Sequence, residues 1–337
     1  MVRKYMSKGM KRDKALEIAG ISKNQFYHQS NHRKPGRRKS AITEKLNHLT
    51  KEKEEVQNEV VLLRAIHIKL DPDHAKWYRI ITQSLQMEGY YINHKKLLRL
   101  MKEYDVLEER IRPSDKQYVR HKKVLPTSPL EIIEMDIKYF WIAGSQQYAF
   151  VLTIIDTFTR FVLYWTHGYS MKSPQVKLAW EFVIVHFLQP CKLELKDVIV
   201  EVRTDNGPQF ESKATRDYLE ENGIKHRFIR PYTPEENGHI ESFHNTLTKA
   251  LERDVFEDIH QLEARLKKFY TTYNNHRSHS SLRGIPPAIF WALYDLNKIT
   301  VTKDENKFTV YYKLKVAYQE ILIIPGINKY QHRAIHS

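Results

Sequence analysis

The apolar pattern of the chain changes its period at Pro129, and this change most constrains the fold. Before Pro129, apolar residues recur at helical spacing in three stretches between residues 54 and 112. After Pro129, short β-branched and aromatic runs are separated by turn residues, and strand-like and helix-like runs then alternate. This order predicts an α/β domain with a mixed sheet, preceded by all-α units.

The same patterns divide the chain into six segments. We expect a helix-turn-helix unit at 1–31, a basic linker and helix at 32–53, a second helical unit at 54–112, a linker at 113–129, the α/β domain at 130–295 and a small β-hairpin tail at 296–337. Within the α/β domain, three strands are followed by a helix at 173–188, a strand at 198–204, a helix at 211–221, a strand at 225–230 and helices at 234–252, 259–275 and 286–294.

Net charge indicates the partner. The chain of 337 residues carries a formal charge of +15, and residues 1–41 hold twelve Lys and Arg against Asp13 and Glu17, which is +10 of that total. A basic surface of this kind favours double-stranded DNA, because neutralising phosphates releases counterions. The alternative is a basic surface that is only solvated.

Compartment is indicated by two further features of the sequence. The single cysteine, Cys191, cannot form an internal disulfide, and no run approaches eighteen apolar residues. We therefore expect a soluble cytoplasmic protein, associated with the nucleoid when bound to DNA, with no membrane contact.

Three groups of residues are candidates for DNA contact. In the first unit, Gly20 and Ser22 separate two short helices, and the second helix would present its polar residues to the major groove. The basic linker would follow phosphates or enter a minor groove. A helix capped by Asn93 in the second unit is another candidate, unless its basic face is only solvated. The residues are Lys23, Asn24, Gln25 and Tyr27, then Arg33, Lys34, Arg37 and Arg38, then Lys95, Lys96 and Arg99.

A heptad-like spacing begins after Ser40. The apolar residues Ile42, Leu46, Leu49, Val56, Val60 and Leu63 fit a helix that either forms a coiled coil with a second chain or packs within its own chain. The pattern leaves both possibilities open.

Three carboxylates of the α/β domain stand out. In the strand expected at 130–140, alternation places Asp136 opposite the apolar face, together with Glu134. Asp205 ends the strand at 198–204, where ligands bind in open α/β sheets, and the following Asn206 and Gly207 would form a tight turn that leaves the carboxylate free.

The third carboxylate, Glu241, belongs to a helix that Thr233 and Glu236 would cap. It shares a face with Asn237 and His244 and borders the buried stripe of that helix. Each acid alone has an ordinary alternative: an ion pair for Asp136, a turn for Asp205, a surface position for Glu241. Taken together, they make an oxygen-only site suited to Mg²⁺ or Mn²⁺, with two ions able to assist phosphoryl transfer.

Longer motifs around these acids resemble a known family. The stretches TDNGPQF and YTPEENGHIESFHNTL, with thirty-five residues from Asp205 to Glu241, resemble the integrase core of retroviral integrases and DDE transposases. The stretches YNNHRSHSSLRGIPPAIFW and KWYRIITQSLQMEGYYINHKKLLRLMKEYDVL are similar to bacterial transposases of the insertion sequence 3 family.

The resemblance implies an RNase H-like core in which Asp136, Asp205 and Glu241 are both the catalytic triad and the metal ligands. It implies metal-dependent cleavage and transfer of DNA strands at element ends and target, by a homo-oligomer without a small-molecule cofactor, with Asn206, Asn237 and His244 as supporting residues. The family often has Lys or Arg seven residues after the glutamate, where this chain has Thr248 followed by Lys249. A catalytically retired transposase acting as a repressor, or a plain RNase H-type nuclease, remain alternatives.

Overall fold

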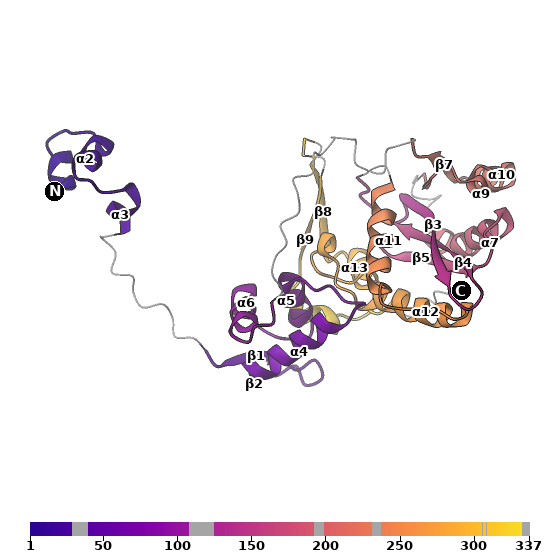
Figure 1. Ribbon diagram of the computed structural model, residues 1–337, viewed down its shortest axis with the longest axis horizontal. Coiled ribbons are helices and arrows are strands. Elements are labelled where there is room, and N and C mark those ends of the chain that lie inside the picture. Colours follow the sequence, from indigo (N-terminus) through magenta and orange to yellow (C-terminus); the bar gives the residue numbers. More distant parts are fainter. Residues whose placement is uncertain are drawn as a thin grey trace. The chain divides into compact units, whose positions relative to one another are not determined.

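The computed structural model of the protein describes residues 1–28, 40–107, 125–191, 199–230, 237–304, 306–307 and 309–331 (Figure 1). The chain divides into two compact units, residues 1–41 and 42–337, which are described separately.

The first unit consists of short helices around a small apolar core. Its helices are α1 (Val2–Met6), α2 (Arg12–Ile18) and α3 (Lys23–His28), and Val2, Ala15 and Leu16 are buried between them. Ser22 Oγ accepts the Gln25 amide at 3.2 Å, and Gln25 Oε1 accepts the Ser22 amide at 3.0 Å. This reciprocal capping box starts α3, as the predicted Ser22 cap requires. Helix α1 was not predicted.

The prediction of a helix after Ser40 is wrong. Residues 42–57 form an antiparallel hairpin of β1 (Ile42–Leu46) and β2 (Lys53–Gln57). The Asn47 side chain accepts the amides of Leu49 and Thr50 and so closes a turn, and Leu49 is 93% exposed. The heptad spacing therefore spans a hairpin and the start of the next helix, and it gives no support for a coiled coil.

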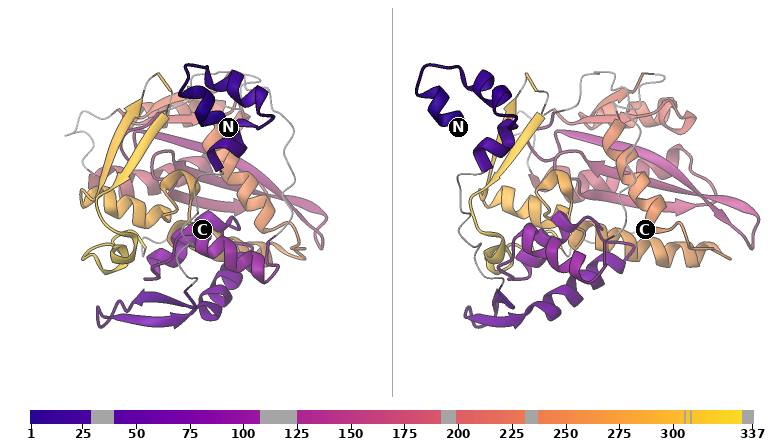
Figure 2. Two further views of the ribbon diagram at one scale, coloured as in Figure 1. Left: turned by 90° about the vertical axis from the view of Figure 1, so that its left-hand side faces the viewer. Right: turned by 60° about the vertical axis from the view of Figure 1, so that its left-hand side comes forward.

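The three helices expected between residues 54 and 112 are confirmed. They are α4 (Asn58–Leu70), α5 (Tyr78–Met87) and α6 (His94–Glu103), and they share a core that includes Val61, Leu85 and Leu97. The Asn93 side chain accepts the Lys96 amide at 2.8 Å and caps α6 as predicted. We call the hairpin and these helices the helical unit; Figure 2 shows it in purple.

A five-stranded mixed sheet forms the centre of the α/β domain. Its order is β5-β4-β3-β6-β7. Strands β3 (Ile132–Ile142), β4 (Gln147–Asp156) and β5 (Val162–Gly168) form an antiparallel meander, whereas β6 (Glu201–Thr204) and β7 (Lys225–Phe228) lie parallel to β3. The expected mixed sheet is thus confirmed, and β3 lies at its centre.

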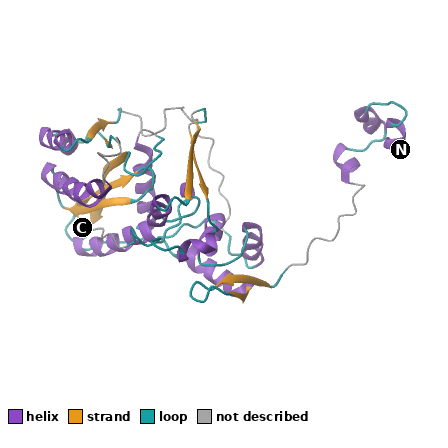
Figure 3. Cartoon of the chain, turned by 180° about the vertical axis from the view of Figure 1, so that it is seen from behind, coloured by secondary structure: helices purple, strands orange, loops and turns teal. Residues whose placement is uncertain are grey.

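Helices cover both faces of this sheet (Figure 3). On one face α7 (Ser173–Val183), continued by a π-helical turn at Ile184–Leu188 and by α8 (Gln189–Cys191), packs on Met135, Ile137 and Leu152. On the other face α11 (Gly238–Ala250) and α12 (Ile259–Asn275) pack on Val151, Ile155 and Trp165. The connection from β6 to β7 contains α9 (Pro208–Glu211) and α10 (Lys213–Glu221).

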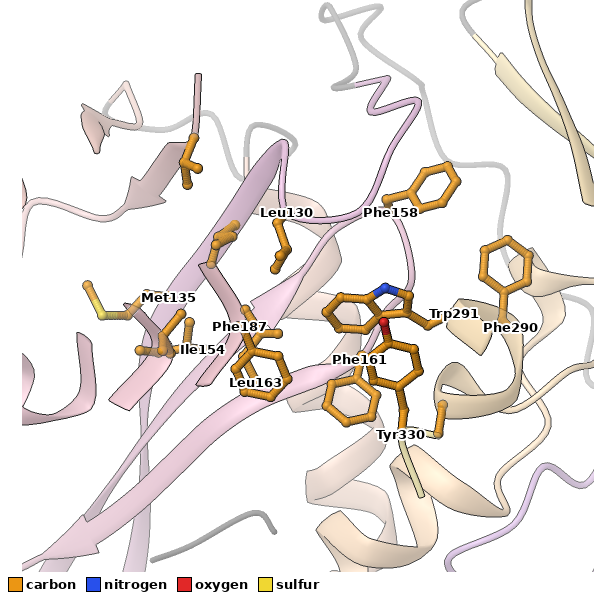
Figure 4. Close-up of a cluster of buried hydrophobic side chains, with 14 of the residues drawn as sticks. Leu130, Met135, Ile154, Phe158, Phe161, Leu163, Phe187, Phe290, Trp291 and Tyr330 are labelled. Atoms are coloured by element: carbon orange, nitrogen blue, oxygen red, sulfur yellow. The ribbon is translucent and has the colours of Figure 1, made fainter. Parts of the chain in front are cut away.

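The carboxyl-terminal segment is part of the same core and no separate tail. Helix α13 (Pro287–Asp295) is followed by the predicted hairpin of β8 (Ile299–Asp304) and β9 (Thr309–Leu314) and by the 3₁₀ turn η5 (Tyr318–Ile323); a further 3₁₀ turn, η4, precedes α13 at Ser280–Leu282. The rings of Trp291 and Tyr330 are stacked with their centroids 4.5 Å apart, beside Phe161 and Phe187 (Figure 4). Alternation predicted the hairpin but could not show what the residues after it bury.

In the part of the chain that the structure describes, no helix is long and apolar enough to span a membrane.

Candidate active site

Strand β3 presents two acids to the face of the sheet that α11 covers. Ile133, Met135 and Ile137 enter the core on the α7 side, so Glu134 and Asp136 belong to the opposite face. Asp136 keeps 27% of its side chain exposed, and its Oδ1 accepts the Ile137 amide at 2.8 Å. The sequence alternation placed both acids correctly.

Asp205 follows the last residue of β6, at the carboxyl end of the strand next to β3. The sequence had suggested that the turn leaves this carboxylate free. That expectation is wrong, because Asp205 Oδ1 accepts a hydrogen bond from the Gly207 amide at 3.0 Å. Burial raises the pKa of the Asp205 carboxyl; the Gly207 hydrogen bond opposes this, and the negative charge of Asp136 adds to it. Asp136 and Asp205 therefore lie near enough to influence each other.

Glu241 lies on the first turn of α11, and two contacts fix that turn on β3. The Ile240 amide donates to Glu134 Oε2 at 2.7 Å, and His244 Nδ1 lies 3.3 Å from Asp136 Oδ2. Glu241 is between these two contacts in sequence and is itself exposed. The predicted cap of Thr233 and Glu236 lies outside the described residues. Within the described residues, α11 starts at Gly238.

Of the three predicted acids, Asp136 and Asp205 are near enough for the charge of one to raise the pKa of the other. Over all residues that it describes, no three His, Cys, Asp or Glu side chains come close enough to hold one metal ion. The two aspartates fit a hard divalent cation, because they are oxygen donors whose mutual repulsion a cation would relieve. The Glu241 carboxylate is not part of this group, although its helix packs on β3.

Glu134 is more deeply placed than the sequence indicated. Glu134 shares a strand face with Asp136, as alternation predicted, and it is 0% exposed. Burial raises the pKa of its carboxyl to about 7, against the opposing effects of the Ile240 amide, Arg160 and Arg203. His239 Nδ1 lies 3.4 Å from Glu134 Oε1. The sequence signal for a role of Glu134 was its position two residues before Asp136 on the same strand face. Alternation alone could not show that α11 covers this side chain.

The three predicted supporting residues have different surroundings. His244 is 6% exposed and contacts Asp136. Asn237 is also 6% exposed and directly precedes α11. Asn206 Nδ2 lies 3.5 Å from the Ile229 carbonyl oxygen, which links the Asp205 turn to the end of β7.

Asp156, a further buried acid of the domain, is structural. Its carboxylate accepts the Leu130 amide at 2.9 Å and the Thr159 amide at 2.8 Å, so it closes the turn after β4.

Several predicted DNA contacts are engaged within the chain. Gln25 forms the cap of α3, and Lys96 Nζ donates to Ile42 O at 2.6 Å and to Thr43 Oγ1 at 2.8 Å, because β1 packs beside α6. Arg99 pairs with Glu103 at 3.7 Å. Lys23 and Lys95 are exposed. The side chains of Asn24 and Tyr27, and Arg33, Lys34, Arg37 and Arg38, lie outside the described residues.

Family models match the domain that this site occupies. Two models, each described as "Integrase core domain", match residues 126–234 and 222–287. The catalytic core of bovine immunodeficiency virus (BIV) integrase aligns at 20% identity with a TM-score of 0.37, over 50% of this chain and 98% of that one. The two family models define the class: the chain contains an integrase core domain, which the five-stranded mixed sheet forms.

Relatives narrow the class further. The chain is 30% identical over 235 residues to the "Insertion element IS476 uncharacterized 39.2 kDa protein" of Xanthomonas euvesicatoria, which is 69% of this chain and 65% of that one. It is 24% identical over 222 residues to the "Putative transposase InsK for insertion sequence element IS150" of Escherichia coli, over 62% of this chain and 75% of that protein. The chain thus spans about two thirds of the length of the first relative and three quarters of the second. The chain is thus similar to proteins of bacterial insertion sequences, and its similarity to them includes the integrase core.

Proposed function

We propose that this chain is a DDE transposase of the insertion sequence 3 type, which binds the terminal inverted repeats of its element and catalyses cleavage and transfer of DNA strands. The observation that carries the proposal is the pair of aspartates on adjacent strands, Asp136 within β3 and Asp205 directly after the carboxyl end of β6, beside the helix that carries Glu241. The family matches and the basic charge of the chain support it.

Asp136 and Asp205 would hold a divalent cation, Mg²⁺ or Mn²⁺, and Glu241 would complete the ligand set after a change of its rotamer or a small shift of α11. Such ions, two in the fullest form of the proposal, supply Lewis-acid activation of the attacking oxygen and neutralise the charge that develops on the phosphate. The chain itself does the positioning. Glu134 and His244 hold α11 on β3 and would in this way keep Glu241 close to the two aspartates.

DNA is the proposed substrate in two roles, as the element end that is cleaved and as the target that the end is joined to. In the amino-terminal unit, Lys23 and the linker residues would bind phosphates, and in the helical unit the exposed Lys95 would do so. Joining two element ends requires two sets of DNA contacts, which is the reason to propose a homo-oligomer on DNA.

The test uses the full chain, Mg²⁺ or Mn²⁺, and labelled duplexes that contain the DNA flanking the reading frame. We expect nicking at the element end and joined products, and we expect Asp205→Asn and Glu241→Gln to lower both by at least about 1,000-fold because each removes a ligand. Duplex binding should stay within about twofold in both variants. Full activity in either variant would refute the assignment.

One observation favours a second candidate. Because Glu241 does not join the aspartate pair in the described structure, a retired transposase that represses transcription by binding DNA is the alternative. It predicts sequence-specific binding of the flanking DNA without any nicked product, even in Mn²⁺. Nicking that ignores sequence and gives no joined product would instead indicate a plain RNase H-type nuclease.

A further inference from the structure

A basic groove lies between the end of α11 and the segment that follows α4. Its volume is about 430 Å³, and its cations are Lys69, Lys76, Lys249 and Arg253. We call it the α4–α11 groove. The helical unit supplies one wall and the helix that carries Glu241 supplies the other, which is consistent with their neighbouring positions in Figures 1 and 2.

Three of these cations are not neutralised by the chain. Lys76, Lys249 and Arg253 are exposed, and among the described residues none of them forms an ion pair with a carboxylate. Lys69 differs, because its ammonium donates to the Val106 carbonyl oxygen.

The acids of the groove leave a positive excess. Asp254 is already paired with Arg265 at 2.8 Å, so Glu252 is the remaining carboxylate in the lining. Three solvent-facing cations against one acid, in a hollow, form a site for an extended polyanion.

An exposed aromatic ring directly follows the groove residue Lys76 in the sequence. Trp77 follows Lys76 and is 50% exposed, and the Arg79 guanidinium lies 5.3 Å from its ring centroid. Cations that can follow a phosphate backbone, next to a ring on which a base or sugar can pack, are typical of nucleic-acid contacts. We therefore favour DNA over a small anion or an acidic peptide.

Lys249 reaches the groove from the last turn of α11, next to Thr248. Thr248 Oγ1 donates to the His244 carbonyl oxygen at 2.8 Å, so this side chain is bound to its own helix. Lys249 is eight residues after Glu241, and a helical rise of 1.5 Å per residue separates them by about 12 Å along the axis. At 3.4 Å per nucleotide along one strand, this corresponds to about three or four nucleotides.

We propose that the α4–α11 groove binds the DNA backbone about three to four nucleotides from the phosphate that meets Glu241, with Lys76, Lys249 and Arg253 as the phosphate contacts. This inference rests on the proposed transposase function. It assigns part of the DNA binding to a surface that neither the helix-turn-helix unit nor the three acids provide.

The experiment compares two triple variants of the full chain. One changes Lys76, Lys249 and Arg253 to Gln, and the matched control changes the exposed Lys267, Lys268 and Lys313 to Gln. Binding of a fluorescein-labelled duplex is measured over a series of salt concentrations. We expect the slope of log K against log salt to become less steep by about 2 to 3 in the groove variant, since each lost phosphate contact contributes about 0.9. The slope of log K against log salt in the control variant should be closer to that of the unmodified chain than the slope in the groove variant is.

A second arm locates the contact. Neutral methylphosphonates are placed three and four nucleotides from the scissile position of the duplex. They should weaken binding of the unmodified chain at least about tenfold at low salt and leave the groove variant nearly unaffected. If the groove variant behaves as the control does, or if methylphosphonates weaken both proteins equally, the inference is wrong.

The outcome is separable from that of the proposed function. Cleavage and joining with an unchanged salt slope would contradict the groove and keep the transposase. A reduced slope without any cleavage would keep the groove as a DNA site and contradict the transposase. Thermal unfolding of both triple variants confirms that they remain folded.

Discussion

Individual residues show what a side chain's type can and cannot indicate. Asp136 and Asp205 occupy the positions that strand alternation and strand ends predict. Gln25 and Lys96 were equally good candidates by type, yet one caps a helix and the other donates to a strand that is distant in sequence. Polar residues satisfy the backbone as readily as they bind a ligand, and only the fold distinguishes the two roles.

At the scale of single residues, the lowered pKa of His226 leads us to expect that the unfolding free energy depends on pH. Burial lowers the pKa of its imidazole to about 4, and Arg216 acts in the same direction, while His226 Nε2 lies 2.9 Å from Thr204 Oγ1. The unfolded chain takes up a proton below about pH 6.5, whereas the folded chain does so only near 4, so stability contributed by the neutral ring is lost as the pH falls through this window. Allowing for its partial exposure, we expect a loss of about 1 kcal/mol.

Urea unfolding of the unmodified chain and of His226→Gln at pH 7 and pH 5 measures this loss. The glutamine keeps a neutral polar group and should lose less stability on acidification than the unmodified chain. An equal loss in both proteins would assign the effect to other groups.

At the scale of elements, α11 depends on one buried acid. Glu134 on β3 accepts the amide of Ile240, which is adjacent to Glu241, so the strand holds the first turn of the helix directly. The hydrogen bond therefore sets the distance between the strand that carries Asp136 and the helix that carries Glu241.

Replacing Glu134 tests this link. Glu134→Ala leaves the buried amide without its acceptor, and we expect a loss of about 1 to 3 kcal/mol in unfolding free energy together with a fall in strand cleavage. Glu134→Gln keeps an acceptor and should restore most of the cleavage. Asp156→Asn is the control: it also changes a buried acid, at a turn away from α11, and it should lower stability without changing the cleavage rate of the folded fraction. Failure of the glutamine to restore cleavage would show that the charge of Glu134 matters more than its hydrogen bond.

Most elements of the α/β domain could be predicted because their apolar patterns are long and their turns are marked. The strands around Asp136 and Asp205 and the helix of Glu241 lie where the sequence places them. The hairpin at 42–57 could not be distinguished from a helix, because its apolar residues happen to repeat every seven positions and its turn depends on the Asn47 side chain. Burial of Glu134 was equally out of reach, since it results from the packing of a helix about a hundred residues further along the chain.

On the scale of the whole molecule, residues from both ends of the second unit support the α/β domain. Tyr330 packs into the core beside Trp291, and Gln319 Nε2 donates to the Tyr90 carbonyl oxygen of the helical unit at 3.1 Å. The carboxyl-terminal segment thus joins the helical unit to the domain that carries the acids. The α4–α11 groove lies within this same unit, so a DNA strand bound there would be held by the body that holds the proposed active site.

The central claim is that three acids from β3, β6 and α11 meet around a divalent ion. Anomalous scattering from crystals of the full chain grown with Mn²⁺ and a DNA end tests it most directly. The account predicts a manganese peak bound by oxygens of Asp136 and Asp205, with a Glu241 oxygen drawn to about 2.2 Å from a metal ion. A map with no manganese between the two aspartates, or with Glu241 still apart while DNA is bound, would contradict it.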